Sequence, residues 1–213
     1  MDVFASVCRE YGRDFWLYIQ TVGLSLDHVP NERDLRWQCY TGLSFGVKTF
    51  IHFTYGSYNE TSYPNWTHSM VKKDGTPTPT YYAAQKVNNE LNAISDTYVQ
   101  YKNLGAFNVN CTSSTPYLAF DNQYKSDLIT SIDSNRPILV GCFEKKEGEG
   151  KAFTVVNMAN IYSVAKANVT FKLSQAQTVT AYIFGEPTIL APDANGNYTL
   201  SLENGQGVFI TVD

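Results

Sequence analysis

Two apolar runs decide the fold: FWLYIQTV at residues 15–22 and VKTFIHFTY at residues 47–55. Both carry β-branched and aromatic residues on both faces, which is typical of strands in a parallel sheet covered on two sides. The residues between them predict a helix, because Asn31 is placed as its N-cap and Gly46 as its stop. Parallel neighbours need such a crossover helix, so this stretch predicts a strand, a helix and a second strand.

Two further helices flank this unit. Residues 3–11 have helical spacing and stop before Gly12, while Thr78 and Pro79 open a third helix as its N-cap and first residue. We expect that third helix to close at Leu104 and Gly105. The apolar stripes expected on the last two helices are Leu35, Cys39 and Leu43, and then Val87, Leu91, Ile94 and Tyr98.

Beyond Gly105 the helical period disappears, and short apolar runs separated by turn residues take its place. Six or more short strands at this spacing favour an antiparallel β-sandwich or barrel. The fold class expected is therefore α/β plus all-β, with a βαβα segment at residues 1–105 and a β-sandwich domain at residues 106–213. Asp193, Asn195 and Asn197 around Gly196 predict a hairpin turn. The expected strands are 138–143, 153–158, 168–173, 178–184, 198–202 and 207–212.

A family resemblance rests on FWLYIQ at 15–20, RDLRWQCYTGLSFGVKTFIHFTYG at 33–56 and DGTPTPTYYAAQKVNNEL at 74–91. These segments resemble the last two βα units of a glycoside-hydrolase (β/α)₈ barrel, nearest to the β-galactosidase-like enzymes of family 42 and related clan A hydrolases. LVGCFEKKEGEGKAFTVVN at 139–157 and the closing LENGQGVFITVD at 202–213 are similar to the β-sandwich that commonly follows such barrels. The resemblance covers nearly the whole chain.

The length of the first segment conflicts with a complete barrel. A (β/α)₈ barrel takes about 250 residues, and residues 1–105 supply two strands of it. Roughly six of the eight units would then lie upstream, so the chain is expected to be the C-terminal part of a hydrolase, as a truncated or split gene product or as a fragment. The alternative is self-association or a partner chain that completes the sheet, because a two-stranded parallel sheet leaves its edges uncovered.

The chemistry implied by the resemblance is incomplete in this chain. Family members place an acid/base carboxyl after the fourth barrel strand and a nucleophilic glutamate after the seventh, which FWLYIQ would represent. Alternation along this strand puts Trp16, Tyr18 and Gln20 on one face and leaves the other, all-apolar face to meet the helices. Gln20 stands at that strand end, and an amide cannot act as the carboxylate nucleophile. The catalytic residues therefore stay unassigned and an enzymatic role stays open. Gln20 is expected either to contact a sugar hydroxyl or to be a hydrogen-bonded residue at a strand end.

Three aromatic or imidazole side chains complete the candidate substrate-binding set. His52 is expected to point into the barrel near its carboxyl rim, or else to be a hydrogen-bonded core residue. The long loop at 55–78 offers Tyr55 and Trp66, whose flat faces suit the apolar face of a sugar ring if the loop faces substrate rather than packing against the protein. Glu60 is the one acid of this loop considered as a surrogate catalyst.

The composition of the chain narrows the classes of partner that we expect. The net charge is −4 and no basic run is present, so neither nucleic acid nor an anionic membrane is an expected partner. Aromatic residues make up 14% and charged ones 17%, which suits carbohydrate recognition. No motif calls for a metal or cofactor, and the four cysteines are far apart, which predicts buried and unpaired thiols. The chain as given has no signal peptide or long apolar segment and is expected to be cytoplasmic; its location is otherwise unknown.

The functional hypothesis is a glycoside-hydrolase-like segment involved in carbohydrate hydrolysis or recognition, which is not catalytic alone. The alternative is a non-catalytic carbohydrate-binding or structural module that assembles with another chain. Fold-level likeness does not separate the two, since one fold carries many functions.

Overall fold

A computed structural model describes residues 1–23, 28–56, 69–111, 123–160, 162–174 and 178–213. These residues contain three helices and mostly antiparallel strands, so the fold is α+β with a strand-rich second part. In chain order the elements are α1 (Asp2–Glu10), β1 (Trp16–Gln20), α2 (Glu32–Ser44), β2 (Thr49–Phe53), α3 (Pro79–Tyr98), β3 (Tyr101–Val109), β4 (Ile129–Ser134), β5 (Ile138–Lys145), β6 (Lys151–Asn157), β7 (Ala167–Leu173), β8 (Val179–Ile183), β9 (Glu186–Leu190), β10 (Tyr198–Leu202) and β11 (Gly207–Val212).

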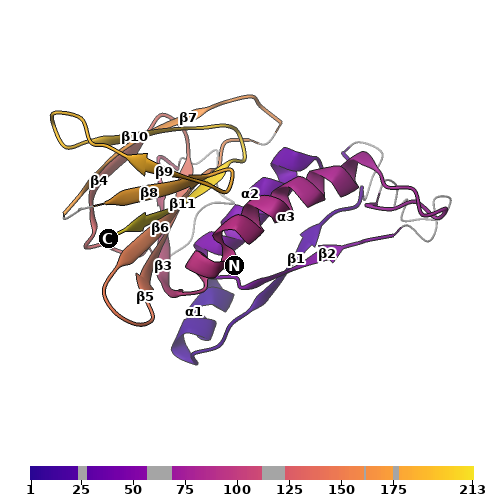
Figure 1. Cartoon of the computed structure of the whole chain (residues 1–213), viewed down its shortest axis with the longest axis horizontal. Coiled ribbons are helices and arrows are strands. Elements are labelled where there is room, and N and C mark those ends of the chain that lie inside the picture. The colour runs from indigo at the N-terminus through magenta and orange to yellow at the C-terminus, as the bar shows by residue number, and fades with distance from the viewer. Residues whose placement is uncertain (24–27, 57–68, 112–122, 161, 175–177) are drawn as a thin grey trace.

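The elements are stacked in layers with a helical layer in the middle. Figure 1 shows α2 and α3 lying side by side between the strand-rich part and the β1–β2 pair. A six-stranded sheet in the order β3-β5-β6-β11-β8-β9 packs on one side of the helices, and the two-stranded sheet packs on the other. A three-stranded sheet in the order β10-β7-β4 covers the far face of the six-stranded sheet through a common apolar core.

The parallel unit predicted from the first part of the sequence is present. β1 and β2 pair in parallel and are connected through α2. α2 begins as expected at Asn31, whose side chain accepts a hydrogen bond from the Arg33 backbone N–H, while the Asp34 carboxylate accepts one from the Asn31 backbone N–H. Such a reciprocal cap leaves two fewer unpaired donors at the start of the helix and fixes where it begins.

α2 is buried on two sides, which its predicted single apolar stripe did not anticipate. Leu35 and Cys39 pack toward β1, whereas Leu43 packs against the six-stranded sheet. Close approach on that second side depends on glycine: a Cβ on Gly141 would lie 2.3 Å from the Ser44 carbonyl oxygen. A Cβ on Gly207 would likewise lie 2.3 Å from the Tyr40 Cβ, and one on Gly42 would meet Phe50 at 2.8 Å. The helix is therefore held tightly between two sheets.

The strand-rich part contains every strand expected from the sequence and three that were not expected: β3, β4 and β9. All pairings within its two sheets are antiparallel. β11 is buried along its whole length because one face meets α2 and the other meets the three-stranded sheet. β7 alternates between buried and exposed residues because only one of its faces is covered.

Three local expectations are wrong. α3 ends at Tyr98 rather than at Gly105, and residues 101–109 form β3, which pairs with β5 across a bulge between Asn103 and Gly105. Asp193 does organise a turn with Gly196 at φ +78°, but the turn connects strands of different sheets and is not a hairpin. No disulfide joins the four cysteines, but only Cys39 and Cys142 are buried; Cys8 is half-buried and Cys111 exposed.

Candidate functional site

The face of β1 and β2 turned away from the helices is the most exposed aromatic surface of the parallel unit. The register places Trp16, Tyr18 and Gln20 beside Thr49, Ile51 and Phe53. Trp16 is 66% exposed, Tyr18 67% and Phe53 37%, although these side chains are large and apolar. We call the side chains of these six residues the open face. Leu17 and Ile19, on the other face, pack against the helices as expected.

Gln20 is held by hydrogen bonds at the carboxyl end of β1. Its backbone N–H donates to the Gln38 Oε1 at 2.7 Å, and the Gln38 Nε2 donates to the Gln20 carbonyl at 3.2 Å. The Gln20 Nε2 donates to the Val22 carbonyl at 2.8 Å. One N–H and the side-chain oxygen of this amide take no part in that contact and can serve a ligand.

His52 points the opposite way from the expected barrel interior. It pairs in register with Ile19, so it lies on the face of the sheet that the helices cover. Its Nε2 lies 3.3 Å from the Asn88 Nδ2 on α3, and burial lowers the pKa of His52, opposed by that hydrogen bond. The expected inward orientation of His52 is therefore wrong. Alternation along β2 does not show which of its faces the helices cover, whereas the register with β1 does. The structure does not bring His52 and Gln20 to one surface.

The other two predicted side chains belong to the loop after β2. Tyr55 is 63% exposed, and its backbone carbonyl accepts a hydrogen bond from the Val71 N–H at 2.8 Å. This contact holds Tyr55 near the carboxyl end of β2 with its ring in solvent. Trp66 and Glu60 lie outside the described residues.

The open face carries no carboxylate and no imidazole. None of its six residues is an aspartate, a glutamate or a histidine, so it offers aromatic rings and one amide. Such rings stack on flat apolar surfaces, and an amide both donates and accepts hydrogen bonds. Within the described part of the chain, β1 and β2 pair only with each other, so each has one edge without a neighbouring strand, although the Gln38 side chain bonds the Gln20 backbone N–H and carbonyl.

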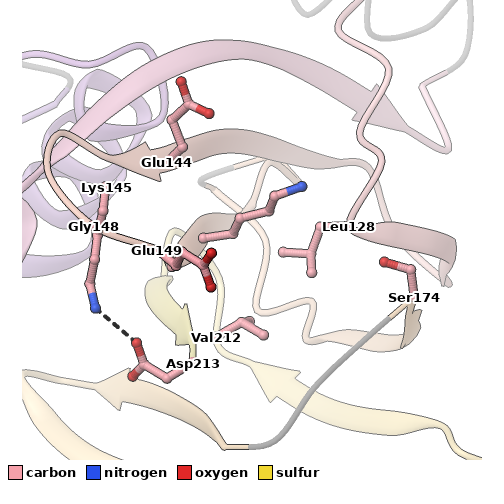
Figure 2. Close-up of a pocket in the computed structure, with 10 residues that line it drawn as sticks. Leu128, Glu144, Lys145, Gly148, Glu149, Ser174, Val212 and Asp213 are labelled. Atoms are coloured by element: carbon pink, nitrogen blue, oxygen red, sulfur yellow. Dashed lines mark hydrogen bonds and ion pairs between the residues drawn. The ribbon is translucent and has the colours of Figure 1, made fainter.

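A hollow of about 510 Å³ lies at the end of the strand-rich part. Figure 2 shows Leu128 and Val212 on its apolar side, with charged groups of the turn between β5 and β6 around it. The Lys145 Nζ donates to the Asp213 carboxylate at 3.0 Å, and Lys151 pairs with Asp127 at 2.6 Å. Its two lysines are paired with carboxylates within the protein, so among the described residues the hollow has no unpaired cation to recognise an anion.

The described residues contain no group of three or more His, Cys, Asp or Glu side chains that could hold a metal ion. None of the helices among them is both long and apolar enough to cross a membrane. No protein-family model matches the chain, and no curated protein matches it.

The predicted contact residues did not include Trp16 and Tyr18, which carry the two most exposed rings of the open face. Trp16 and Tyr18 alternate with Leu17 on β1 and were expected on the face of Gln20, but only Gln20 was predicted to contact a ligand. Their signal was present in the sequence, because large aromatic residues alternating toward the same face as a strand-end amide mark one surface. Their exposure to solvent was not expected, because the resemblance places this face inside a complete barrel, whose interior is filled by side chains.

Proposed function

We propose that the chain is a glycoside-hydrolase-like segment that takes part in carbohydrate recognition or hydrolysis and is not catalytic by itself. In this proposal β1, α2, β2 and α3 are the last two units of a (β/α)₈ barrel, and β3 to β11 are the β-sandwich that follows it. In such a barrel the helices lie outside and the other sheet face lines the interior. The open face would then be part of the barrel's inner wall.

The observation that carries this proposal is the exposure of Trp16 and Tyr18 on the same sheet face as Gln20. A sheet face that is aromatic and uncovered is costly in a soluble chain, so it favours a surface used for contact. Aromatic rings with a neighbouring amide match the apolar face and the hydroxyl rim of a sugar. The unpaired edges of β1 and β2 support completion of the sheet by other polypeptide.

The direct test is calorimetric titration of the chain with a series of neutral oligosaccharides. We expect saturable heat from at least one of them, lost in Trp16→Ala and Tyr18→Ala because each removes a stacking ring. Tyr82→Ala is the matched control, since Tyr82 is 58% exposed but lies on α3 away from the open face. No heat with any oligosaccharide, or equal loss in the control, would contradict sugar recognition by this face.

The absence of turnover is the second test. We expect no hydrolysis of a panel of nitrophenyl glycosides by the chain alone, because glycoside hydrolysis normally requires a pair of carboxyl groups and the open face has none. Turnover by the chain alone would contradict the proposal. Turnover lost in Glu60→Gln would assign catalysis to the loop after β2.

The alternative is a non-catalytic carbohydrate-binding or structural module that assembles with another chain. The lack of any carboxylate on the open face favours it over an independent enzyme. Light scattering distinguishes a binding module from a module that assembles with another chain. A stable monomer that binds sugar supports a binding module. Concentration-dependent self-association abolished by Trp16→Lys supports assembly through the open face.

A further inference from the structure

A separate cavity of about 730 Å³ lies at the amino end of β1 and β2, between α1 and the start of β3. Phe15 and Lys48, which directly precede the two parallel strands, both line it. Gln20 lies at the carboxyl end of β1, so the cavity is at the opposite end of the strands from the site described above. Its cationic lining residues are Arg9, Arg13, Lys48, Lys102 and Lys146.

Most of this positive charge is not neutralised inside the protein. The acids that line the cavity are Glu10 and Asp14, against five cations. Lys102 pairs with Glu144 at 2.8 Å. Among the described residues, none of the other four cations makes an ion pair, and these four include Lys48 and Lys146. This is the reverse of the hollow near Asp213, where lysines and carboxylates pair.

Lys48 and Arg9 are half-buried cations whose N–H donors are only partly used by the protein. The Lys48 Nζ donates to the Tyr101 carbonyl at 3.1 Å and lies 3.9 Å from the centre of the Tyr98 ring. Because an ammonium has three N–H donors, Lys48 keeps donors for a ligand. The Arg9 Nη1 donates to the Asn103 Oδ1 at 2.8 Å, which holds its guanidinium in the wall of the cavity, and the negative charge of Asp2 also acts on it. A guanidinium has five N–H donors, so it can bind a ligand in addition to Asn103.

The surroundings of Lys48 give a second sign of uncompensated charge. Burial and, to a lesser extent, the positive charge of Lys146 lower the pKa of Lys48 to about 8, against a smaller opposing effect of Asp14. Cations that are desolvated and repel one another are stabilised when an anion enters between them.

We propose that this cationic cavity binds a small oxyanion, phosphate or sulfate, either free or carried by a sugar. Lys48, Lys146 and Arg9 are the residues assigned to contact it. Charged N–H groups match the oxygen atoms of these anions, and guanidinium groups bind them in two-point contacts. The proposal does not depend on carbohydrate binding at the open face, because it uses other residues at the other end of the strands.

Calorimetric titration of the whole chain at pH 7 tests it, with sodium phosphate, sodium sulfate and glucose 6-phosphate as the probes. Sodium chloride at matched ionic strength and neutral glucose are the reference titrations, because general screening would act with any salt. We expect saturable binding of the oxyanions, weakened about tenfold or more in Lys48→Met and Lys146→Met, since a hydrogen bond to a charged group is worth about 1.5–3 kcal/mol.

Two further variants separate binding from folding. Lys48→Arg keeps the charge and should keep the binding, and Lys73→Met removes an exposed lysine in the loop before α3 and should change nothing. Thermal unfolding without added anion checks that each variant is folded. Glucose 6-phosphate bound at least tenfold more tightly than phosphate would identify a sugar-borne anion, and equal affinity would identify the free ion. No saturable binding beyond that of chloride, or unchanged affinity in both Met variants, would overturn the proposal.

Discussion

The two-stranded sheet and the six-stranded sheet share the helices α2 and α3 but differ in what lies beyond them. The six-stranded sheet packs against the helices on one face and against β4, β7 and β10 on the other. The β1–β2 pair packs against the helices on one face and meets solvent on the other. Phe209 on β11 is fully buried, whereas Trp16 on β1 is 66% exposed. Aromatic residues therefore stabilise the fold in one sheet and are available for contact in the other.

The largest expected effect follows from removing a ring where both faces are covered. Phe209 packs edge-on against Tyr98, Tyr101 and Phe143, with centroid distances of 5.5, 5.7 and 6.1 Å. Phe209→Ala leaves a cavity there and should lower the free energy of unfolding by roughly 3–5 kcal/mol. Urea denaturation measures this change. A loss below about 1 kcal/mol would mean that the helical layer does not depend on the six-stranded sheet.

The next effect concerns the ion pair inside the helical layer. Arg36 donates to both oxygens of Glu90 at 2.8 and 2.7 Å, and the two side chains are 6% and 5% exposed. Arg36→Met leaves the Glu90 carboxylate buried without its partner and should cost on the order of 3 kcal/mol. The double variant Arg36→Met with Glu90→Met should recover much of that loss in the same denaturation experiment. If the double variant is as unstable as Arg36→Met, the lost stability comes from packing and not from the unpaired charge.

A smaller expected effect is the pH dependence of stability that Lys48 in the cationic cavity contributes. The pKa of Lys48 is about 8 in the folded chain against an ordinary value of 10.5, so between these values the unfolded chain binds the extra proton. The contribution of Lys48 to the free energy of unfolding therefore rises with pH across that window. The difference between the wild-type chain and Lys48→Met should rise likewise in denaturation curves at pH 7.5 to 10, in buffers without phosphate or sulfate.

The groups that face Lys48 enter this prediction as well. The repelling cation is Lys146, Asp14 opposes it, and Arg9, Glu10, Arg13 and Lys102 line the same cavity. Lys146→Met should make the dependence shallower, because it removes a cation that lowers the pKa of Lys48. A difference between wild type and Lys48→Met that stays flat with pH would show that the amine is not desolvated.

The smallest expected effect is on the open face. Trp16→Ala should change the free energy of unfolding by about 0.5 kcal/mol or less, because the ring is already largely in water. The same variant is expected to lose oligosaccharide binding, so denaturation and titration together separate contact from stability. A loss of several kcal/mol would mean that Trp16 is buried in solution, and would favour self-association through this face.

Local signals in the sequence were sufficient for the order of most elements. Asn31 located the start of α2 as its N-cap, and Pro79 that of α3 as its first residue, because caps and proline act within one helical turn. Thr78 occupies the N-cap position of α3, but its hydroxyl donates to the Ser69 and Met70 carbonyls and makes no cap hydrogen bond. β3 was missed since its register is broken at Gly105, and glycine there suggested a helix end instead. β9 was missed because its residues are mostly exposed and include Pro187, so it has no apolar alternation.

The candidate site was harder to predict because it depends on contacts distant in sequence. Alternation correctly put Trp16, Tyr18 and Gln20 on one side of β1, but it could not say that His52 pairs with Ile19 and faces α3. The cationic cavity has no local pattern: Arg9, Lys48 and Lys146 come from three separate parts of the chain and meet only in the fold. Charge counts over the whole sequence, which is acidic, gave no indication of it.

The glycines beneath α2 have a practical consequence for protein engineering. Gly141 and Gly207 let the helix backbone sit almost directly on β5 and β11, so the six-stranded sheet is shaped to one helix at one distance. A shortened chain that begins after α3 would expose the ring of Phe209 and the backbone around these glycines to water. We expect such a product to aggregate. A foreign helix grafted in place of α2 would need an equally close-fitting surface at Tyr40 and Ser44.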